Sequence, residues 1–265
     1  MDFTIQIANK IIRIESIFPE LKTFCKEYLT EDITPDFSVH LTEEDIRTEH
    51  NLSADPDTHS PQYLETLVAL RKIAEKMPFF QRMLMHGAAI TYCGDAFLFT
   101  APSDTGKSTH IKLWKKYLCD KVDIINGDKP ILSFDHPFES EELISDSEHH
   151  PKNNSPESQH VTIRIHGTPW SGKEHWQKNQ SGELKGICLL KQSPHNSIQR
   201  IQPADFLPEL MKQIYFPTDT RAAEYTLDLL NTLLTQVPLY LLNCNISEEA
   251  VACSFEALTG TKYPR

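Results

Sequence analysis

Lysine 107 and Ser108 close a segment whose residue types suit phosphate binding. Residues 98–116 have the sequence LFTAPSDTGKSTHIKLWKK, which meets the pattern G-x-x-x-x-G-K-[ST] except that Ala101 replaces its first glycine. In such a P-loop, backbone N–H groups converge on the phosphates, the lysine reaches the terminal phosphates and the Ser or Thr holds magnesium. We therefore expect a nucleotide phosphate site made of Ser103, Asp104, Thr105, Gly106, Lys107, Ser108 and Thr109.

The surroundings of this segment favour the phosphate site over a Ser/Thr-rich helix start with an exposed lysine. The apolar run over 96–100 predicts a strand buried on both faces. Ile111, Trp114 and Leu118 predict the buried stripe of a helix, whose N-terminus attracts anions. Asp104 is a second departure from the pattern. Aspartate adopts left-handed backbone more readily than most residues, but its carboxylate must point away from bound phosphates.

Asp128 is the expected partner of the phosphate site. It follows the apolar strand predicted over 122–126. In P-loop enzymes an acid at this place meets the magnesium ion or the attacking hydroxyl. The alternative is a turn residue, because Asn-Gly-Asp favours turns.

Four segments together resemble one family. HGAAI (86–90), FLFTAPSDTGKSTH (97–110), INGDKP (125–130) and GTPWSGKEHW (167–176), in this order, are similar to the HPr kinase/phosphorylase-related kinases. The catalytic domain of that family is similar to that of phosphoenolpyruvate carboxykinase. The resemblance covers roughly residues 60–260. It implies an α/β nucleotide-binding fold, ATP and Mg²⁺ as cofactors, and phosphoryl transfer to a hydroxyl group.

The resemblance also implies roles for single residues. Lys107 would neutralise the β- and γ-phosphates, and Ser108 with Asp128 would hold the metal. His86 matches a histidine near the family's active site, with a purely structural histidine as the alternative. The family's protein kinases carry two adjacent aspartates where this chain has Gly127 and Asp128, so Asp128 serves as base, metal partner or both. This departure puts the phosphorylase reaction, and HPr as substrate, in doubt.

The segment 167–176 is expected to contact the phosphate acceptor. Two glycines bracket a rigid aromatic loop, and a lysine beside an aromatic ring suits a phosphate or polar acceptor. The predicted acceptor-binding residues are His86, Trp170, Lys173 and Glu174. The acceptor stays open between a small metabolite, such as a sugar or free serine, and a serine in a peptide or protein. Two other functions stay open, a phosphoenolpyruvate carboxykinase-like enzyme and a nucleotide-sensing module without turnover.

Composition bounds the partners. The chain of 265 residues has 26 basic and 37 acidic residues and a net charge of −11, which argues against broad nucleic-acid binding. The sequence shows no signal peptide and no membrane span. Its six cysteines form no CxxC pair, which indicates reduced cysteines in the core of a cytoplasmic protein. A homo-oligomer is left open.

The expected organisation is one α/β domain with a mixed sheet. Residues 1–60 form a strand-rich N-terminal part, with a hairpin over 3–14, a short helix in 19–29, a strand over 37–41 and a loop over 44–60. Residues 61–265 form the P-loop core, which starts with a helix capped by Ser60. Within this core we expect a mobile loop at 135–160, whose His149 and His150 either bind a metal or are solvated.

The remaining expected elements of the core follow from hydrophobic patterning. Strands are predicted over 86–92, 96–100, 122–126, 160–167, 184–190, 197–201 and 238–244. Helices are predicted near 203–214, 219–236 and 247–258. In the second of these, Ala223, Leu227, Leu230 and Leu234 are expected to form the buried stripe.

Overall fold

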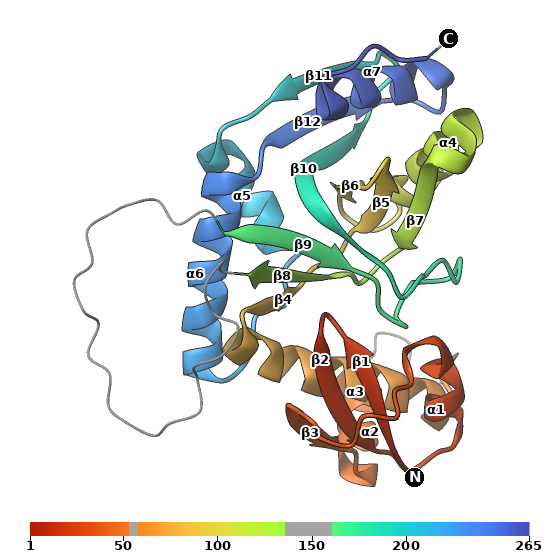
Figure 1. The fold of residues 1–265 in the computed structure, drawn as a ribbon, viewed down its shortest axis with the longest axis vertical. Helices are drawn as coiled ribbons and strands as arrows, with labels where there is room; N and C mark the ends of the chain where they lie inside the picture. The colour runs from red at the N-terminus through yellow and green to blue at the C-terminus, as the bar shows by residue number, and fades with distance from the viewer. Residues whose placement is uncertain (53–57, 136–160, 265) are drawn as a thin grey trace, which may run out of the picture.

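The computed structural model describes residues 1–52, 58–135 and 161–264, which form a mixed α/β fold with two β-sheets (Figure 1). A small sheet near the N-terminus lies at one end of the molecule, and a large curled sheet makes up the rest. The predicted loop at 135–160, with His149 and His150, lies outside the described residues except for Asp135, which ends a strand.

The small sheet contains the predicted hairpin. Strands β1 (Asp2–Ile7) and β2 (Lys10–Glu15) pair antiparallel, and β3 (Phe37–His40) pairs parallel with β2. The connecting residues Ala8 and Asn9 have φ values of 51° and 59°, as a two-residue hairpin turn requires. The short helix predicted in 19–29 is present as α1 (Glu20–Phe24) and the 3₁₀ turn η1 (Lys26–Tyr28).

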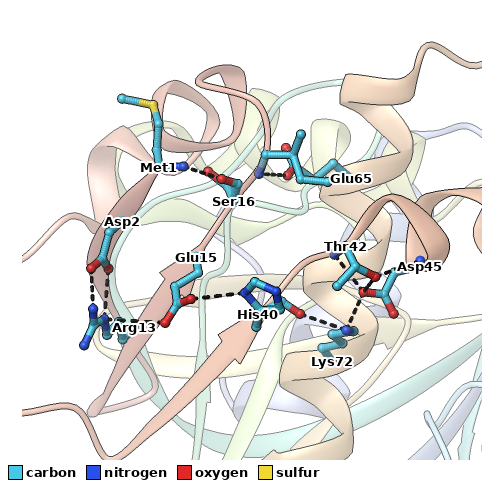
Figure 2. A network of polar contacts seen from close by, with 11 residues as sticks. Met1, Asp2, Arg13, Glu15, Ser16, His40, Thr42, Asp45, Glu65 and Lys72 are labelled. Carbon is cyan, nitrogen blue, oxygen red and sulfur yellow. Dashed lines mark hydrogen bonds and ion pairs between the residues drawn. The ribbon is translucent and has the colours of Figure 1, made fainter.

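The prediction of a loop over 44–60 was wrong in its first half, because α2 (Glu43–Leu52) is helical. Thr42 and Asp45 cap this helix reciprocally: the Asp45 N–H donates to Thr42 Oγ1 at 3.2 Å, and the Thr42 N–H donates to Asp45 Oδ2 at 2.8 Å (Figure 2). Asp45 also pairs with Lys72 at 2.6 Å, and Ile46 is buried. These caps and tertiary contacts stabilise a helix whose polar composition gives little periodic signal.

Helix α3 (Pro61–Lys76), followed by the 3₁₀ turn η3 (Met77–Phe80), joins the two sheets. Ser60 caps α3 as predicted, with its Oγ accepting from the Tyr63 N–H at 3.2 Å. The buried Glu65 carboxylate accepts the backbone N–H groups of Ile17 and Phe18, which attaches the helix to the small sheet (Figure 2). The hydrophobic side chains of α3 pack with those of β1–β3 and with Leu84 and Ile131 of the large sheet.

Nine strands of the described chain form the large sheet, in the order β4-β8-β9-β10-β6-β5-β7 with β12 on β10 and β11 on β12. Their bounds are β4 (Arg82–Leu84), β5 (Ala88–Tyr92), β6 (Asp95–Thr100), β7 (Val122–Asn126), β8 (Ile131–Asp135), β9 (Thr162–His166), β10 (Ser181–Gln192), β11 (Ser197–Arg200) and β12 (Leu239–Cys244). The long strand β10 pairs antiparallel with β9 at its start and parallel with β6 and then β12 further on, so the sheet curls about it. Strands β4 and β8 were not predicted.

Helices cover both faces of the large sheet around β6. On one face, Phe97 and Phe99 of β6 pack in a hydrophobic cluster with α4 (Lys107–Leu118) and α7 (Glu248–Thr259). Ala96 and Leu98 pack in the opposite cluster with α5 (Pro203–Met211) and α6 (Thr220–Gln236). This alternation is the period of a strand, and it confirms that β6 is buried on both faces. The predicted stripe of α4, Ile111, Trp114 and Leu118, is also buried.

The predicted stripe of α6 was displaced around the helix. Leu227 is 49% exposed, and the buried residues are Ala222, Thr226, Leu229, Leu230 and Leu233. Since both sets repeat at helical spacing, sequence periodicity alone does not choose between them. The contacts of α6 with β4 and η3 decide which set is buried.

The 3₁₀ turn η4 (Cys119–Lys121) follows α4 and leads into β7.

Two further sequence expectations bear on the whole chain. Among the described residues, no helix is both long and apolar enough to cross a membrane. All six cysteines are free thiols, but the expectation that they lie in the core was wrong for Cys93 and Cys119, which are exposed.

Candidate active site

Strand β6 ends at Thr100, and residues 101–106 connect it to the first residue of α4, Lys107. Asp104 has φ of 61° and Gly106 has φ of 106°, so the connection contains two left-handed residues. Asp104 is exposed. Ala101 is fully buried with β6 and α4, so the position of the missing glycine holds a methyl group that packs into the core.

Lys107 turns back into this connection. Its ammonium donates to the carbonyl oxygens of Ala101 at 2.9 Å and Pro102 at 3.3 Å, and the residue is only 7% exposed. Burial lowers the pKa of Lys107, while the negative charge of Asp128 acts in the opposite direction. Ser108, in the next position of α4, is half-buried.

Asp128 lies at the centre of a cluster that we call the 86/128 cluster, made of His86, Asp128 and Lys129. The His86 Nε2 is 3.1 Å from Asp128 Oδ1, and the Lys129 ammonium is 3.1 Å from Asp128 Oδ2. Burial would raise the pKa of Asp128, but the hydrogen bond from His86 and the charge of Lys129 outweigh it and lower the pKa to about 2. The carboxylate is thus ionised at neutral pH.

Hydrogen bonds hold the backbone at His86 and the turn at Asp128 in place. His86 is held by Gln213, whose Oε1 is 2.8 Å from His86 Nδ1 and whose carbonyl accepts the His86 N–H at 2.6 Å. The turn after β7 is built on Asn126, whose side-chain oxygen accepts the N–H groups of Asp128 at 2.8 Å and Lys129 at 2.7 Å. Asp128 is therefore both a turn residue and a member of a charged cluster.

Residues 171–172 close tightly over residues 127–128. A Cβ atom at Gly127 would lie 2.7 Å from the Ser171 carbonyl oxygen, and one at Gly172 would lie 3.1 Å from the Asp128 Cβ. Gly172 also has φ of 77°, which favours glycine. Position 127 thus has no room for a second aspartate while this loop keeps its course.

The predicted acceptor residues of segment 167–176 do not share one environment. Trp170 is 5% exposed, donates its indole N–H to the Thr66 carbonyl at 2.7 Å and packs edge-on against Phe24, so it anchors the segment to α3. Lys173 is exposed, and Glu174 pairs with Lys112 of α4 at 3.0 Å on the surface. Of the four predicted acceptor residues, only His86 lies in the 86/128 cluster.

Cavities flank the connection 101–106 on two sides. On the side of α4, two overlapping cavities of about 560 and 580 Å³ lie where the parallel strands β6, β10 and β12 end. Both are lined by Asp104, Thr105, Leu190, Gln192 and Pro194. Gly106 and Asn245 line only the cavity of about 560 Å³. The carboxyl edge of parallel strands is where open α/β sheets bind ligands. His110 also lines this side, and its buried Nδ1 has no hydrogen-bond partner among the described residues.

On the other side lies a cavity of about 430 Å³ that we call the 71/129 cavity. His86, Lys129 and Ser103 form the wall next to the 86/128 cluster. The other wall comes from α2, α3 and the chain after α5, with Glu49, Arg71, Lys212 and Tyr215 as polar residues. Ser103 borders both this cavity and the one of about 580 Å³.

Sequence reasoning missed several residues of this site. Lys129 and Asn126 lie within INGDKP, and their polar character next to Asp128 was a signal that could have been used. Gln213 and Arg71 gave no such signal, because they reach His86 and its cavity only through the fold. Among the described residues, no group of three or more His, Cys, Asp or Glu side chains forms a metal cluster.

The site therefore consists of a left-handed connection, a buried lysine and a charged cluster, with a cavity on each side. No protein-family model matches the chain, and no curated protein matches it either.

Proposed function

We propose that the protein is an ATP-dependent kinase that transfers the γ-phosphate to the hydroxyl group of an acceptor. The observation that carries the proposal is that Ser103 borders both the cavity of about 580 Å³ and the 71/129 cavity, which His86 and Lys129 of the 86/128 cluster also line. Ser103 borders a cavity on each side, so a donor and an acceptor bound in the two cavities would meet beside this cluster.

The donor side agrees with a nucleotide. The connection 101–106 follows a buried strand, precedes α4 and lines the cavities of about 560 and 580 Å³. Backbone N–H groups at the start of α4 and the Lys107 ammonium offer positive charge to phosphates. The cavities on this side have the size of small-molecule sites, and apolar residues such as Leu113, Leu190 and Pro194 offer surface for a base.

The residues present fit a magnesium ion. Mg²⁺ prefers oxygen ligands and usually binds through one or two protein groups together with substrate phosphates. The Ser108 hydroxyl and the ionised Asp128 carboxylate are such groups. A carboxylate has about four lone-pair positions, and His86 and Lys129 occupy two of those of Asp128. When bound, the ion would neutralise charge on the transferring phosphoryl group.

Asp128 and His86 would then act on the acceptor. The new bond joins the acceptor oxygen to the γ-phosphorus, the bond from that phosphorus to the β–γ bridging oxygen breaks, and the hydroxyl proton leaves through Asp128 to solvent. A carboxylate of such low pKa is a weak base. In a loose transition state little proton removal is needed early, so Asp128 contributes mainly by orienting the hydroxyl. Lys107 stabilises charge that moves onto the leaving ADP.

The test is ADP formation measured across sugars, serine, hydroxy acids and serine-containing peptides, together with titration of Mg·ATP. Saturable ADP formation with one acceptor class supports the kinase. A protein that binds Mg·ATP and turns over none of these acceptors would instead agree with a nucleotide-sensing module.

A second candidate is chemistry of the phosphoenolpyruvate carboxykinase type. It requires a metal site with lysine and histidine ligands and an arginine for a dicarboxylate. The observation that favours it is the contact of both His86 and Lys129 with Asp128, with Arg71 across the adjoining cavity. Release of CO₂ from oxaloacetate in the presence of ATP, with no ADP formation from alcohols, would distinguish it from the kinase.

A further inference from the structure

We propose that the acceptor is a small hydroxy acid whose carboxylate binds Arg71 in the 71/129 cavity while its hydroxyl group faces the 86/128 cluster. This inference rests on the proposed kinase function and names the chemical class of its acceptor. It also predicts a binding event that can be measured without turnover.

Positively charged side chains line the 71/129 cavity. Arg71, Lys129 and Lys212 line it together with one carboxylate, that of Glu49. The chain as a whole has a net charge of −11. Each of these cations also pairs with a carboxylate, Arg71 with Glu49, Lys129 with Asp128 and Lys212 with Glu209. They nevertheless line the cavity, and an anionic ligand there would interact with them.

Arg71 is the cation best placed for a carboxylate. Its Nη2 pairs with Glu49 Oε2 at 2.7 Å, which orients the guanidinium, and the residue is 44% exposed in its side chain. Since a guanidinium has five N–H donors, this contact leaves others for a ligand in the cavity. Lys212 is 64% exposed and pairs with Glu209, so it contributes charge with less fixed geometry.

The other residues that line the cavity would set the orientation of the ligand. Lys129 and His86 lie at the wall of the cavity that adjoins Asp128. Leu67, Leu70, Leu84 and Ile214 offer apolar surface to the carbon chain between the two ends. An acceptor with a carboxylate at Arg71 thus places its other end beside the candidate base.

Size and charge also restrict the alternatives. A cavity of about 430 Å³ has the volume of a metabolite site. The Glu49 side chain is only 12% exposed and lies against Arg71, so a dianionic phosphate ester would meet an unfavourable charge there. A ligand with a single carboxylate would be repelled less by Glu49. An amino group next to the ligand's carboxylate would be attracted by Glu49.

The experiment uses pairs of acceptors that differ only in the carboxylate: glycerate with glycerol, and serine with serinol. Glycerol 3-phosphate and a serine-containing peptide complete the set. We expect KM for the acid of each pair to be lower by about tenfold or more, since a hydrogen bond to a charged group contributes about 1.5–3 kcal/mol. Arg71→Gln should remove this preference and raise KM for the acid by about 10- to 100-fold, with KM for ATP unchanged.

Lys72→Gln is the matched control. Lys72 follows Arg71 in α3 and also pairs with α2, through Asp45 at 2.6 Å, but it does not line the cavity (Figure 2). It should keep the preference for the acid. Thermal unfolding of both variants checks that the fold is retained.

Calorimetric titration of glycerate and serine into the protein with a non-hydrolysable ATP analogue gives a readout without turnover. Binding that Arg71→Gln abolishes and Lys72→Gln retains supports the proposal. The proposal is overturned if none of the carboxylates binds, if Arg71→Gln binds them equally, or if the neutral alcohols, the phosphate ester or the peptide are preferred.

These outcomes separate the two proposals. Phosphorylation of neutral acceptors with ATP would retain the kinase and remove the carboxylate site. Arg71-dependent carboxylate binding without any ADP formation would retain the site and remove the kinase.

Discussion

His86 and His166 each lie beside an aspartate and a cation, but the two clusters have opposite surroundings. The 86/128 cluster lies at strand ends and faces a cavity. The second, which we call the 133/166 cluster, consists of Arg82, Ser133, Asp135 and His166 on β4, β8 and β9. There, His166 Nε2 lies 2.9 Å from Ser133 Oγ, which donates to Asp135 Oδ2 at 3.0 Å.

The direction of these hydrogen bonds separates the two. In the 133/166 cluster the Ser133 hydroxyl donates its one hydrogen bond to Asp135, so it can only accept a hydrogen bond from His166 Nε2. His166 is therefore not placed to act as a base toward Ser133. Ser133 is fully buried and His166 is 5% exposed. Histidine, aspartate and a cation therefore form a structural network inside the sheet, and a candidate active site only where a cavity gives a ligand access.

The largest expected effect is on turnover when the aspartate of the 86/128 cluster is changed. Asp128→Asn keeps shape and hydrogen bonding but removes the charge, so we expect kcat to fall by roughly 10²–10⁴-fold, with ATP affinity changed much less. Asp135→Asn is the matched variant of the other cluster. It should lower the melting temperature, because Arg82 loses its ion pair at 3.2 Å, and leave kcat unchanged.

Steady-state kinetics and thermal unfolding of both variants test this contrast. Normal turnover by Asp128→Asn would remove the base assignment and turn attention to His86. A loss confined to ATP affinity and restored by high magnesium would leave Asp128 as a metal partner only.

Lys107→Ala should reduce turnover or Mg·ATP affinity by about 10²-fold or more, because it removes the charge opposite the terminal phosphates. Lys112→Ala is the control on the same helix. Lys112 is half-exposed and pairs with Glu174, so its loss should have little effect on either quantity. Equal ATP titration curves and equal turnover for Lys107→Ala and the unchanged protein would remove the phosphate-site assignment.

The local chemistry of the site was predictable, and its distant partners were not. The left-handed Asp104 and the buried stripe of α4 follow from residue types and spacing within one segment. Gln213 binds His86 across 127 positions of sequence, and Trp170 binds Thr66 across 104. A single sequence does not show such pairs, so Trp170 was assigned to the acceptor although its indole N–H bonds to α3.

The same limit explains the errors in the fold. Helix α2 was predicted as a loop because its stability comes from the cap at Thr42 and contacts with α3, while its own residues are mostly polar. The stripe of α6 was displaced because two helical faces carry apolar residues, and only the packing against β4 and η3 decides between them.

The 133/166 cluster should be visible in the pH dependence of stability. Burial, aided by the charge of Arg82, lowers the pKa of His166 from 6.5 to about 4. Between these values the unfolded chain binds a proton that the folded protein does not, so the free energy of unfolding falls as pH decreases from 6.5 to about 4. The contribution of this histidine is about 3 kcal/mol.

His166→Gln should remove that part of the dependence, which urea unfolding at pH 7 and pH 4 would measure. Part of the slope should persist, since burial also lowers the pKa of His110 to about 4. A variant with the full slope of the unchanged protein would contradict this account. Asp128 acts at lower pH, because its stabilisation is lost only as pH falls from 3.8 toward about 2.

The smallest expected effect concerns the packing that gives the 86/128 cluster its single aspartate. Gly127→Ala adds only a Cβ atom, which would lie 2.7 Å from the Ser171 carbonyl oxygen, so the loop must shift. We expect a loss of about 1–3 kcal/mol in the free energy of unfolding, as for overpacking elsewhere in proteins. Because Gly172 of the same loop packs on the Asp128 side chain, kcat should fall as well.

Gly127→Asp should cost more stability and should not create a second functional carboxylate. Urea unfolding and acceptor kinetics of both variants test this. Full stability of Gly127→Asp together with increased turnover would contradict this expectation. It would show that the loop at 171–172 moves readily and that the site accepts two adjacent aspartates.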